Sequence, residues 1–255
     1  MKRSKKAKGK RKNQNIKEVR EILAEIKEKL KGKFIVFDGP DGSGKSTQIK
    51  KLAEYFEKNG IPVVATQDPG GTKIGEQIRQ LLKYGAKGKM DVTTETFLFM
   101  ASRSQLVQEV IKPAKENGKV ILCDRYISAT CAYQGAGGYS IDEIITLGKL
   151  AVGDIWPDLT IILDISPEEG RARTGQQKNQ KTKDKHKDAQ QSFLFPNVTV
   201  DRFDSRPLDY HRKVRKEFLK LKEYYPSRIE IVDVSNSDEI SVQEKILNLL
   251  MKTDF

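Results

Sequence analysis

Residues 33–47, KFIVFDGPDGSGKST, constrain the fold of this chain more than any other stretch. Four consecutive apolar residues (34–37) predict a strand buried on both faces, and the next segment fits the pattern G-x-x-x-x-G-K-[ST] at every fixed position. Apolar residues at helical spacing follow, so strand, glycine-rich loop and helix stand in the order that a phosphate-binding loop requires. The competing interpretation is an ordinary glycine-rich turn before a helix, and the three contexts together favour the phosphate-binding loop.

Such a loop holds phosphate mainly with its backbone. Its glycines let successive N–H groups converge on the phosphate oxygens, and the helix N-terminus adds partial positive charge. In this pattern Lys45 reaches the β- and γ-phosphates, and the Ser46 hydroxyl ligates Mg²⁺. The stretch therefore predicts a phosphate cradle with a magnesium ligand.

The length and composition describe one α/β domain with an appendage. At 255 residues the chain exceeds an ordinary domain of about 200 residues. It has no run of about 18 apolar residues and no apolar h-region at its N-terminus, so we expect neither a membrane span nor a secretory signal. Cys123 and Cys131 fit no C-x-x-C pattern, which favours a reducing compartment and a cytoplasmic location.

The net charge of +12 is concentrated at the N-terminus. Residues 1–33 hold fourteen Lys or Arg and four Glu, which leaves +2 for the other 222 residues. Residues 1–15 lack apolar periodicity and are expected to be disordered, whereas residues 16–31 have apolar residues at helical spacing and predict an amphipathic helix that packs on the body or on a second subunit. Two roles stay open for this basic tail: binding RNA, DNA or an acidic surface by counterion release, or serving as a solubilising extension.

Strand and helix patterns alternate through residues 32–255. Further buried strands are expected at residues 61–66, 120–124, 159–165 and 228–234, with helices between them that begin near residues 74, 93, 141, 208 and 241. Alternation of this kind predicts a parallel sheet with right-handed crossovers. The fold class is therefore α/β, a P-loop NTPase-type five-stranded parallel sheet with helices on both faces and a lid.

Three segments are expected to depart from regular structure. Pro113 is expected to kink the long helix that runs from about residue 93 to 117. The composition of residues 127–139 predicts a polar loop at the site. After a helix that opens at Pro167 and breaks off past Arg173, a polar low-complexity insert is expected to be mobile, inside a lid at about residues 166–206.

Two further pairs of residues suggest a site. Asp124 ends a predicted strand and Arg125 follows it, so both are expected in the crevice that holds Lys45, where an aspartate can bind magnesium; the alternative is a helix-capping aspartate beside a surface arginine. Phe99 and Arg103 share one helix face at i, i+4. Taken alone, that pair favours a core aromatic beside a solvated arginine.

The chain resembles the bacterial-type thymidylate kinases, nucleoside monophosphate kinases of the P-loop class that convert dTMP to dTDP with ATP and Mg²⁺. Four separated stretches carry the likeness: FDGPDGSGKSTQ (37–48), DPGGTKIGEQIR (68–79), FLFMASRSQLV (97–107) and DRYISATCAYQGAG (124–137). PDLTIILDISPEEGRAR (157–173) and DRFD (201–204) extend it. The likeness covers the chain from about residue 33 to its end, apart from the insert, and implies a homodimer.

The resemblance also implies a role for each matching residue. The catalytic set would be Asp41, Lys45, Arg125 and Arg173. ATP would be bound by Gly39, Gly42, Ser43, Gly44, Lys45, Ser46, Thr47 and Arg202, and Mg²⁺ by Ser46 and Asp124. The dTMP set would be Asp41, Asp68, Pro69, Arg79, Phe99, Arg103, Arg125, Thr130, Tyr133 and Gln134. Within that set, Asp41 would accept from the sugar hydroxyl, Phe99 would stack on thymine, Arg103 would donate to a thymine carbonyl, and Tyr133 would pack beneath the deoxyribose.

The chemistry agrees with these roles. Phosphoryl transfer to a monophosphate, which is already ionised at neutral pH, needs neutralised charge and alignment more than a general base, and the chain offers only His186 and His211. Because Gly42 follows Asp41, the resemblance implies that the transition-state arginine comes from the lid, with Arg173 as the first candidate and Arg202 as the second.

Four positions depart from the usual pattern of the family. Asp38, Gln67, Ala129 and Gly138 stand where Glu, Arg, Ser and Arg are usual. The arginines at 79, 103 and 125 remain, so we predict an active enzyme.

Three alternatives stay open at this point. The first is a kinase of another nucleotide or of a deoxynucleoside, which would need a base to take a hydroxyl proton. The second is a nucleic-acid-associated ATPase that uses the basic tail, although such enzymes place a second carboxylate where Arg125 stands. The third is a non-catalytic interaction module, which an intact phosphate-binding loop makes the weakest of the three.

Overall fold

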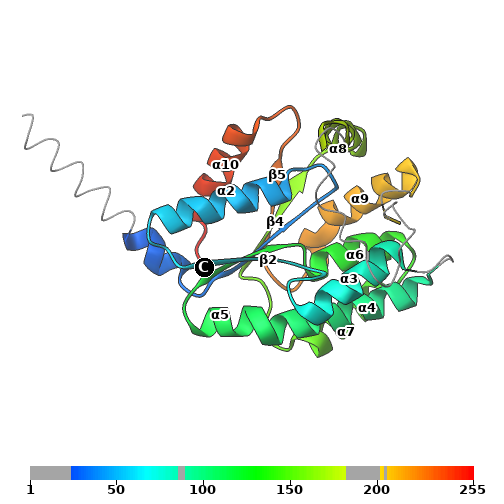
Figure 1. Cartoon of the computed structure of the whole chain (residues 1–255), viewed down its shortest axis with the longest axis horizontal. Coiled ribbons are helices and arrows are strands. Elements are labelled where there is room, and N and C mark those ends of the chain that lie inside the picture. The colour runs from blue at the N-terminus through cyan, green and yellow to red at the C-terminus, as the bar shows by residue number, and fades with distance from the viewer. Residues whose placement is uncertain (1–23, 86–89, 182–201, 204–205) are drawn as a thin grey trace, which may run out of the picture.

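The computed structural model describes residues 24–85, 90–181, 202–203 and 206–255 (Figure 1). Its centre is a sheet of five parallel strands in the order β2-β3-β1-β4-β5. The strands are β1 (Phe34–Asp38), β2 (Val63–Gln67), β3 (Val120–Asp124), β4 (Leu159–Asp164) and β5 (Ile229–Asp233). The predicted five-stranded parallel α/β sheet is therefore confirmed.

The two faces of β1 explain why its apolar run is unbroken. Phe34 and Val36 belong to a core shared with helices α4 (Val92–Leu106), α6 (Ile127–Ala136), α7 (Ile141–Val152) and α9 (Leu208–Tyr224). Ile35 and Phe37 face a second core shared with α2 (Lys45–Lys58) and α10 (Glu239–Lys252). A strand covered on both faces has no polar side to alternate with, and Figure 1 shows helices above and below the sheet.

The N-terminal end of the described chain packs onto the body. Residues 24–30 are helical, and Leu30 is buried in the second core with Ile26 against it. Over residues 24–30, the predicted amphipathic helix thus contacts the body. A domain boundary at residue 31 would therefore separate Leu30 from the core into which it packs. The predicted disordered stretch of residues 1–15 lies outside the described residues.

The long helix keeps its predicted span, and its regular α-helical geometry is interrupted just before Pro113. Helix α4 passes into a π-helical turn, η1 (Val107–Ile111), and then into α5 (Lys112–Glu116). Pro113 has no N–H to donate to the preceding turn, and the wider turn directly before it is where the helix accommodates that loss. Asp91 caps the start of α4 by accepting from the N–H of Thr93.

The prediction of a polar loop at residues 127–139 was wrong, because this segment opens with α6. Every side chain from Ile127 to Gln134 is buried. The polar members of this helix meet polar partners: Ser128 donates to Asp38, Thr130 accepts from Arg103, and Gln134 donates to Glu95. Buried polar groups are tolerated when they are paired in this way, and sequence polarity alone does not reveal the partners.

The remaining helices appear where they were expected. They are α3 (Lys73–Tyr84), α8 (Pro167–Lys181) and the helices α7, α9 and α10. Helix α8 continues beyond Arg173 to Lys181 instead of breaking off, since its Gln and Lys residues are good helix formers. The rest of the polar insert lies outside the described residues. No helix in the part of the chain that the structure describes is long and apolar enough to cross a membrane.

Candidate active site

The phosphate-binding loop (residues 39–46) connects β1 to α2, and two of its glycines are required by its geometry. Gly39 has φ 127° and Gly42 has φ 80°, values that side chains other than glycine rarely adopt. A Cβ atom at Gly39 would lie 2.3 Å from the carbonyl oxygen of Leu163, and one at Gly42 would lie 2.2 Å from that of Gly170. The loop is therefore pressed between β4 and the lid helix α8.

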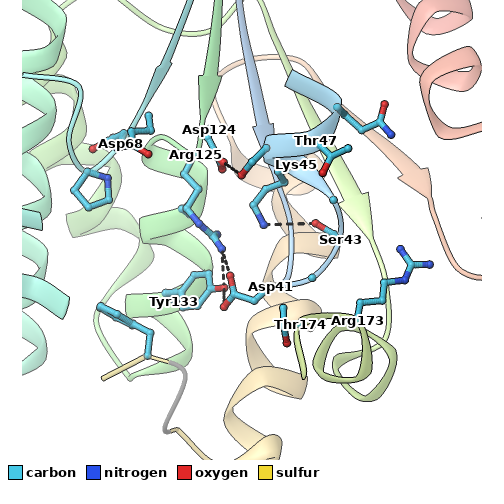
Figure 2. A pocket seen from close by; sticks show the side chains of 18 of the residues that line it. Asp41, Ser43, Lys45, Thr47, Asp68, Asp124, Arg125, Tyr133, Arg173 and Thr174 are labelled. Carbon is cyan, nitrogen blue, oxygen red and sulfur yellow. Dashed lines mark hydrogen bonds and ion pairs between the residues drawn. The ribbon is translucent and has the colours of Figure 1, made fainter. Parts of the chain in front are cut away.

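Lys45 curls back over this loop. Its ammonium is buried and donates to the carbonyl oxygens of Gly39 (3.1 Å) and Pro40 (2.9 Å). Burial and the nearby Arg125 guanidinium lower the pKa of Lys45. The charge sits within the loop itself, where phosphate oxygens would be expected, and Figure 2 shows it pointing toward the Ser43 side.

The two predicted magnesium ligands lie together. Ser46 Oγ donates to Asp124 Oδ2 over 2.6 Å, which joins the first turn of α2 to the end of β3. The pairing follows from topology, because β1 and β3 are neighbours and their carboxyl ends meet at one edge. The residues on this edge offer a hydroxyl and a carboxylate oxygen, the donors that Mg²⁺ prefers.

Arg125 is the centre of a charged cluster between the loop and α6 (Figure 2). Its guanidinium donates to Asp38 (3.1 Å), Asp41 (2.5 Å) and the hydroxyl of Tyr133 (3.1 Å). Burial lowers the pKa of Arg125, but the facing Tyr133, Asp41 and Asp38 outweigh it and hold that pKa well above its usual value. Its backbone is left-handed, at φ 71°, and such strain concentrates at functional sites.

Asp38 supports this cluster from beneath, and sequence reasoning did not assign it a role. The carboxylate is fully buried and also accepts from Gly39 N (2.9 Å) and Ser128 Oγ (2.7 Å). Burial raises the pKa of Asp38, while Arg125 and the hydrogen bond from Ser128 lower it less. Asp38 stands next to the first glycine of the loop, and that adjacency was the available signal.

Arg103 is buried and bonded to the protein. It is 1% exposed, and its Nε donates to Asp68 Oδ2 over 2.5 Å. A second nitrogen, Nη2, donates to the carbonyl oxygen of Tyr126 and to Thr130 Oγ1, both at 3.0 Å. Burial raises the pKa of Asp68, with the Arg103 charge opposing it. The predicted donation from Arg103 to a thymine carbonyl stays a prediction, since Asp68 and Thr130 line the cavity and Arg103 lies behind them.

A second buried carboxylate, Glu95, was missed by the sequence reasoning. It is fully buried and accepts from Arg202 Nη2 (2.6 Å), Arg206 Nη2 (2.7 Å) and Gln134 Nε2 (3.1 Å). The signal was its spacing, because Glu95 precedes Phe99 by four residues on the same helix face.

Arg202 therefore lies away from the phosphate-binding loop. Besides Glu95 it contacts the carbonyl oxygen of Leu82 (3.0 Å), next to α3 and α4. The structure does not bring it together with the ATP-binding residues with which it was predicted. The buried carboxylate of Glu95 attracts its guanidinium to the opposite end of the site.

Arg173 lies beside the phosphate-binding loop, at the end of the cavity that the loop lines. It reaches from α8 to Glu169 (2.6 Å) and to the carbonyl oxygen of Val234 (3.0 Å). It lines the cavity together with Thr174 and the start of α10, and Figure 2 shows both side chains on the lid helix beside the loop.

One cavity of about 710 Å³ joins these parts. Of the predicted site residues, three do not line it: Gly39, Arg103 and Arg202. The others do: Asp41, Gly42, Ser43, Gly44, Lys45, Ser46, Thr47, Asp68, Pro69, Arg79, Phe99, Asp124, Arg125, Thr130, Tyr133, Gln134 and Arg173. Phe203, which follows the insert, also lines it and packs against Phe99 and Tyr133. A cavity with an amide-lined end and an aromatic end suits two nucleotides placed head to head.

Comparison with known proteins gives a consistent result. A family model described as "Thymidylate kinase" matches residues 37–194. The chain is 36% identical to a thymidylate kinase of Bacillus velezensis, over 88% of this chain and 98% of that protein. It is 41% identical to one of Protochlamydia amoebophila, over 87% and 93%. A crystal structure of thymidylate kinase from Ehrlichia chaffeensis superposes with a TM-score of 0.63 at 30% identity, over 86% of this chain and 98% of that one.

Proposed function

The chain belongs to the thymidylate kinase family, and on that premise we propose that it transfers the γ-phosphoryl group of ATP to dTMP, giving dTDP and ADP. One observation carries the proposal. The same cavity is lined at one end by the phosphate-binding loop and at the other by Phe99, Thr130 and Tyr133. Donor and acceptor phosphates would therefore meet near Lys45 and Arg125.

At the donor end, the loop residues 42–47 that were predicted for ATP line the cavity. The N–H groups of residues 42–47 and the Lys45 ammonium would surround the phosphates. Arg173 lines this end and is our choice for the lid arginine. Arg202 is bonded to Glu95 instead, which removes the support for its predicted contact with ATP.

At the acceptor end, we assign dTMP to side chains from four segments. Arg79 and Arg125 would hold its phosphate, since a planar guanidinium binds phosphate through two hydrogen bonds. Arg79 is oriented by donating to the carbonyl oxygen of Pro69 over 2.7 Å. Phe99 would stack on thymine, Thr130 and Gln134 would contact the base edge, and Asp68 with Pro69 would form the wall.

We place the deoxyribose in the cavity beside Tyr133 and Asp41, which both line it. The two side chains are joined by a hydrogen bond of 3.0 Å from Tyr133 Oη to Asp41. Asp41 then has a second oxygen for Arg125 and can accept from a sugar hydroxyl. The ring of Tyr133 would leave no room for a 2′-hydroxyl, so the acceptor is a deoxynucleotide.

Mg²⁺ fits the oxygen donors at Ser46 and Asp124. In the described residues no cluster of three or more Asp, Glu, His or Cys side chains is suited to a metal, so the protein would supply few ligands. Mg²⁺ commonly binds proteins in that way, through one or two side chains plus phosphate oxygens and water. When bound, it would neutralise charge on the ATP phosphates.

The phosphoryl transfer requires that the donor and acceptor phosphates are aligned and that positive groups neutralise their charge. The acceptor phosphate carries its own nucleophilic oxygen, so no side chain has to remove a proton. Arg125 and Lys45 both lie near Asp41 in the cavity, and the moving phosphoryl group would pass close to their positive charges. Closing α8 over the loop would exclude water, which competes as an acceptor.

A coupled assay with ATP and four acceptors tests the function. We expect turnover of dTMP, weaker turnover of dUMP, little of dCMP and none of thymidine. Absence of activity on dTMP would contradict the proposal. Preferential turnover of thymidine would identify a nucleoside kinase instead.

We also propose that the basic N-terminal stretch takes no part in the transfer. Residues 1–23 carry ten Lys or Arg, and their charge suits a polyanion or another acidic surface. Deleting these residues, and keeping the packed Leu30, should preserve the turnover of dTMP and weaken salt-dependent binding to RNA. Loss of ATP consumption, together with dependence on RNA or DNA, would favour the nucleic-acid-associated ATPase.

We place the enzyme in the cytoplasm as a homodimer. The two cysteines are free and buried, which is compatible with a reducing compartment. Exposed apolar side chains on the packed helices α3 and α4, Ile74 and Phe97 (50% and 53% exposed), supply a candidate contact between subunits. Light scattering would check the mass, and a monomer at assay concentration would contradict the dimer.

A further inference from the structure

Within the described residues, only one of the two polar atoms of the Gln134 side-chain amide takes part in a hydrogen bond. Its Nε2 donates to Glu95 Oε2 over 3.1 Å. Its Oε1 is buried and has no hydrogen-bond partner within the part of the chain that the structure describes. The residue is 1% exposed and lines the cavity. A buried acceptor left without a donor is costly, so this atom is suited to a ligand.

Glu95 determines which atom of the Gln134 amide stays without a hydrogen-bond partner among the described residues. Its Oε1 accepts from Arg202 and Arg206, and its Oε2 accepts from Arg206 (2.9 Å) and Gln134. A carboxylate held by two guanidinium groups acts only as an acceptor. The amide of Gln134 must therefore turn its NH₂ toward Glu95 and its oxygen the other way.

Thr130 precedes Gln134 by one helical turn and has the opposite polarity. Its Oγ1 accepts from Arg103 Nη2 over 3.0 Å, which leaves the hydroxyl hydrogen to be donated elsewhere. The face of α6 in the cavity thus offers a donor at 130 and an acceptor at 134. Thymine carries a ring N3–H beside a carbonyl oxygen and matches this pair, whereas cytosine carries a bare N3 in the same place.

We propose that Glu95 is a positioning residue that fixes Gln134 as a hydrogen-bond acceptor, and that it thereby selects bases with an N3–H donor, thymine and uracil, over cytosine. The inference rests on the proposed function, because it assumes that a pyrimidine occupies this end. Glu95 does not line the cavity itself. It acts through Gln134, and the arginines that hold it come from the segment after the insert.

The test uses Glu95→Gln in the full chain. A neutral amide at 95 can donate or accept, so Gln134 can turn either way. We expect the ratio of kcat/KM for dTMP to that for dCMP to fall at least about tenfold, the scale on which a mispaired hydrogen bond acts. The ratio of dTMP to dUMP should stay within about twofold, because both bases carry N3–H. Glu143→Gln, at an exposed position on α7, is the matched control and should change neither ratio.

A double-mutant cycle separates positioning from general damage. In a Gln134→Leu background there is no amide to orient, so Glu95→Gln should leave the dTMP to dCMP ratio unchanged. Equal loss on all three substrates, or an unchanged dTMP to dCMP ratio in the single variant, would overturn the inference. If Glu95→Gln fails to fold, Glu95→Asp is the second variant. It keeps the negative charge that pairs with the arginines, but its shorter side chain moves the carboxylate away from Gln134. An unchanged dTMP to dCMP ratio in that variant would also overturn the inference. Failure of the proposed function would look different, since the wild-type chain would then not turn over dTMP.

Discussion

The two ends of the cavity are built in different ways. The phosphate-binding loop is made of backbone from one contiguous stretch, with glycines at positive φ and an ammonium held by the loop's own carbonyl oxygens. The base end is made of side chains from distant segments. Its Asp68–Arg103 pair joins residues 35 apart in sequence, and its Glu95–Arg202 pair joins residues 107 apart.

Because of this difference, we expect substitutions in the loop to affect mainly catalysis, and substitutions at the base end to affect stability as well. Removing a side chain from the loop should leave the fold largely intact, because the loop geometry is local. Removing a side chain from the base end leaves a buried charge unpaired, so the fold should suffer together with the site. Four predictions follow that comparison from the largest expected effect to the smallest.

Lys45→Met should affect the rate and spare the fold. Loss of the ammonium removes charge stabilisation from the transition state, and we expect kcat to fall about 10²–10³-fold. The free energy of unfolding should change by no more than about 1 kcal/mol, since the hydrogen bonds that are lost all go to the loop itself, to the carbonyl oxygens of Gly39 and Pro40 and to Ser43 Oγ. Steady-state kinetics and urea denaturation check both parts, with Lys50→Met, at an exposed position on the same helix, as control. Retention of half the activity would contradict the assigned role.

Asp68→Ala should do the reverse and strongly destabilise the fold. The Arg103 guanidinium, 1% exposed, would lose its buried counter-charge, at a cost of about 3–5 kcal/mol. Urea denaturation measures this, and the double variant Asp68→Ala/Arg103→Met should recover part of the loss. Asp209→Ala breaks the exposed pair with Arg212 and should destabilise the fold far less, because solvent screens an exposed ion pair. Similar losses for the two single variants would remove the contrast between the two ends.

Gly170→Ala should move the lid helix without touching the base end. A Cβ atom at this position would lie 2.3 Å from the carbonyl oxygen of Asp41, so α8 has to withdraw from the loop and carry Arg173 with it. We expect kcat to fall about tenfold, by loss of part of one charge contact, with KM for dTMP changed less than about twofold. A Cβ atom at Gly175 on the same helix would meet no atom of the described residues within 4 Å, so Gly175→Ala should behave as wild type. A larger change in KM for dTMP than in kcat would place the defect elsewhere.

Asp41→Asn should change how stability depends on pH. Burial raises the pKa of Asp41, but Arg125, Lys45 and Tyr133 outweigh it and lower that pKa from 3.8 to about 2. A lowered carboxyl pKa contributes stability that is present above about pH 4 and lost as the pH falls toward 2. The difference in free energy of unfolding between wild type and variant should therefore shrink over this range. It should stay below about 1 kcal/mol, because the carboxylate is partly exposed; a difference independent of pH would refute the pairing.

Much of the fold could be predicted because its signals are local. Each buried strand is a short apolar run, and most of the helices have apolar residues at a spacing of three or four. The phosphate-binding loop is likewise contiguous, so Lys45 and Ser46 could be assigned from spacing alone. The helix α6 could not, because its polar residues look like a loop until Asp38, Arg103 and Glu95 are known to lie opposite them.

The sequence by itself determined the parallel α/β sheet, the phosphate-binding loop and the family. Only the tertiary structure decided that Arg103 lies behind the cavity wall and that Arg202 binds Glu95 instead of joining the ATP-binding residues. The physical reason is that a backbone cradle depends on neighbours along the chain. The direction of a long arginine side chain depends on which buried carboxylate lies within its reach, and that is a property of packing.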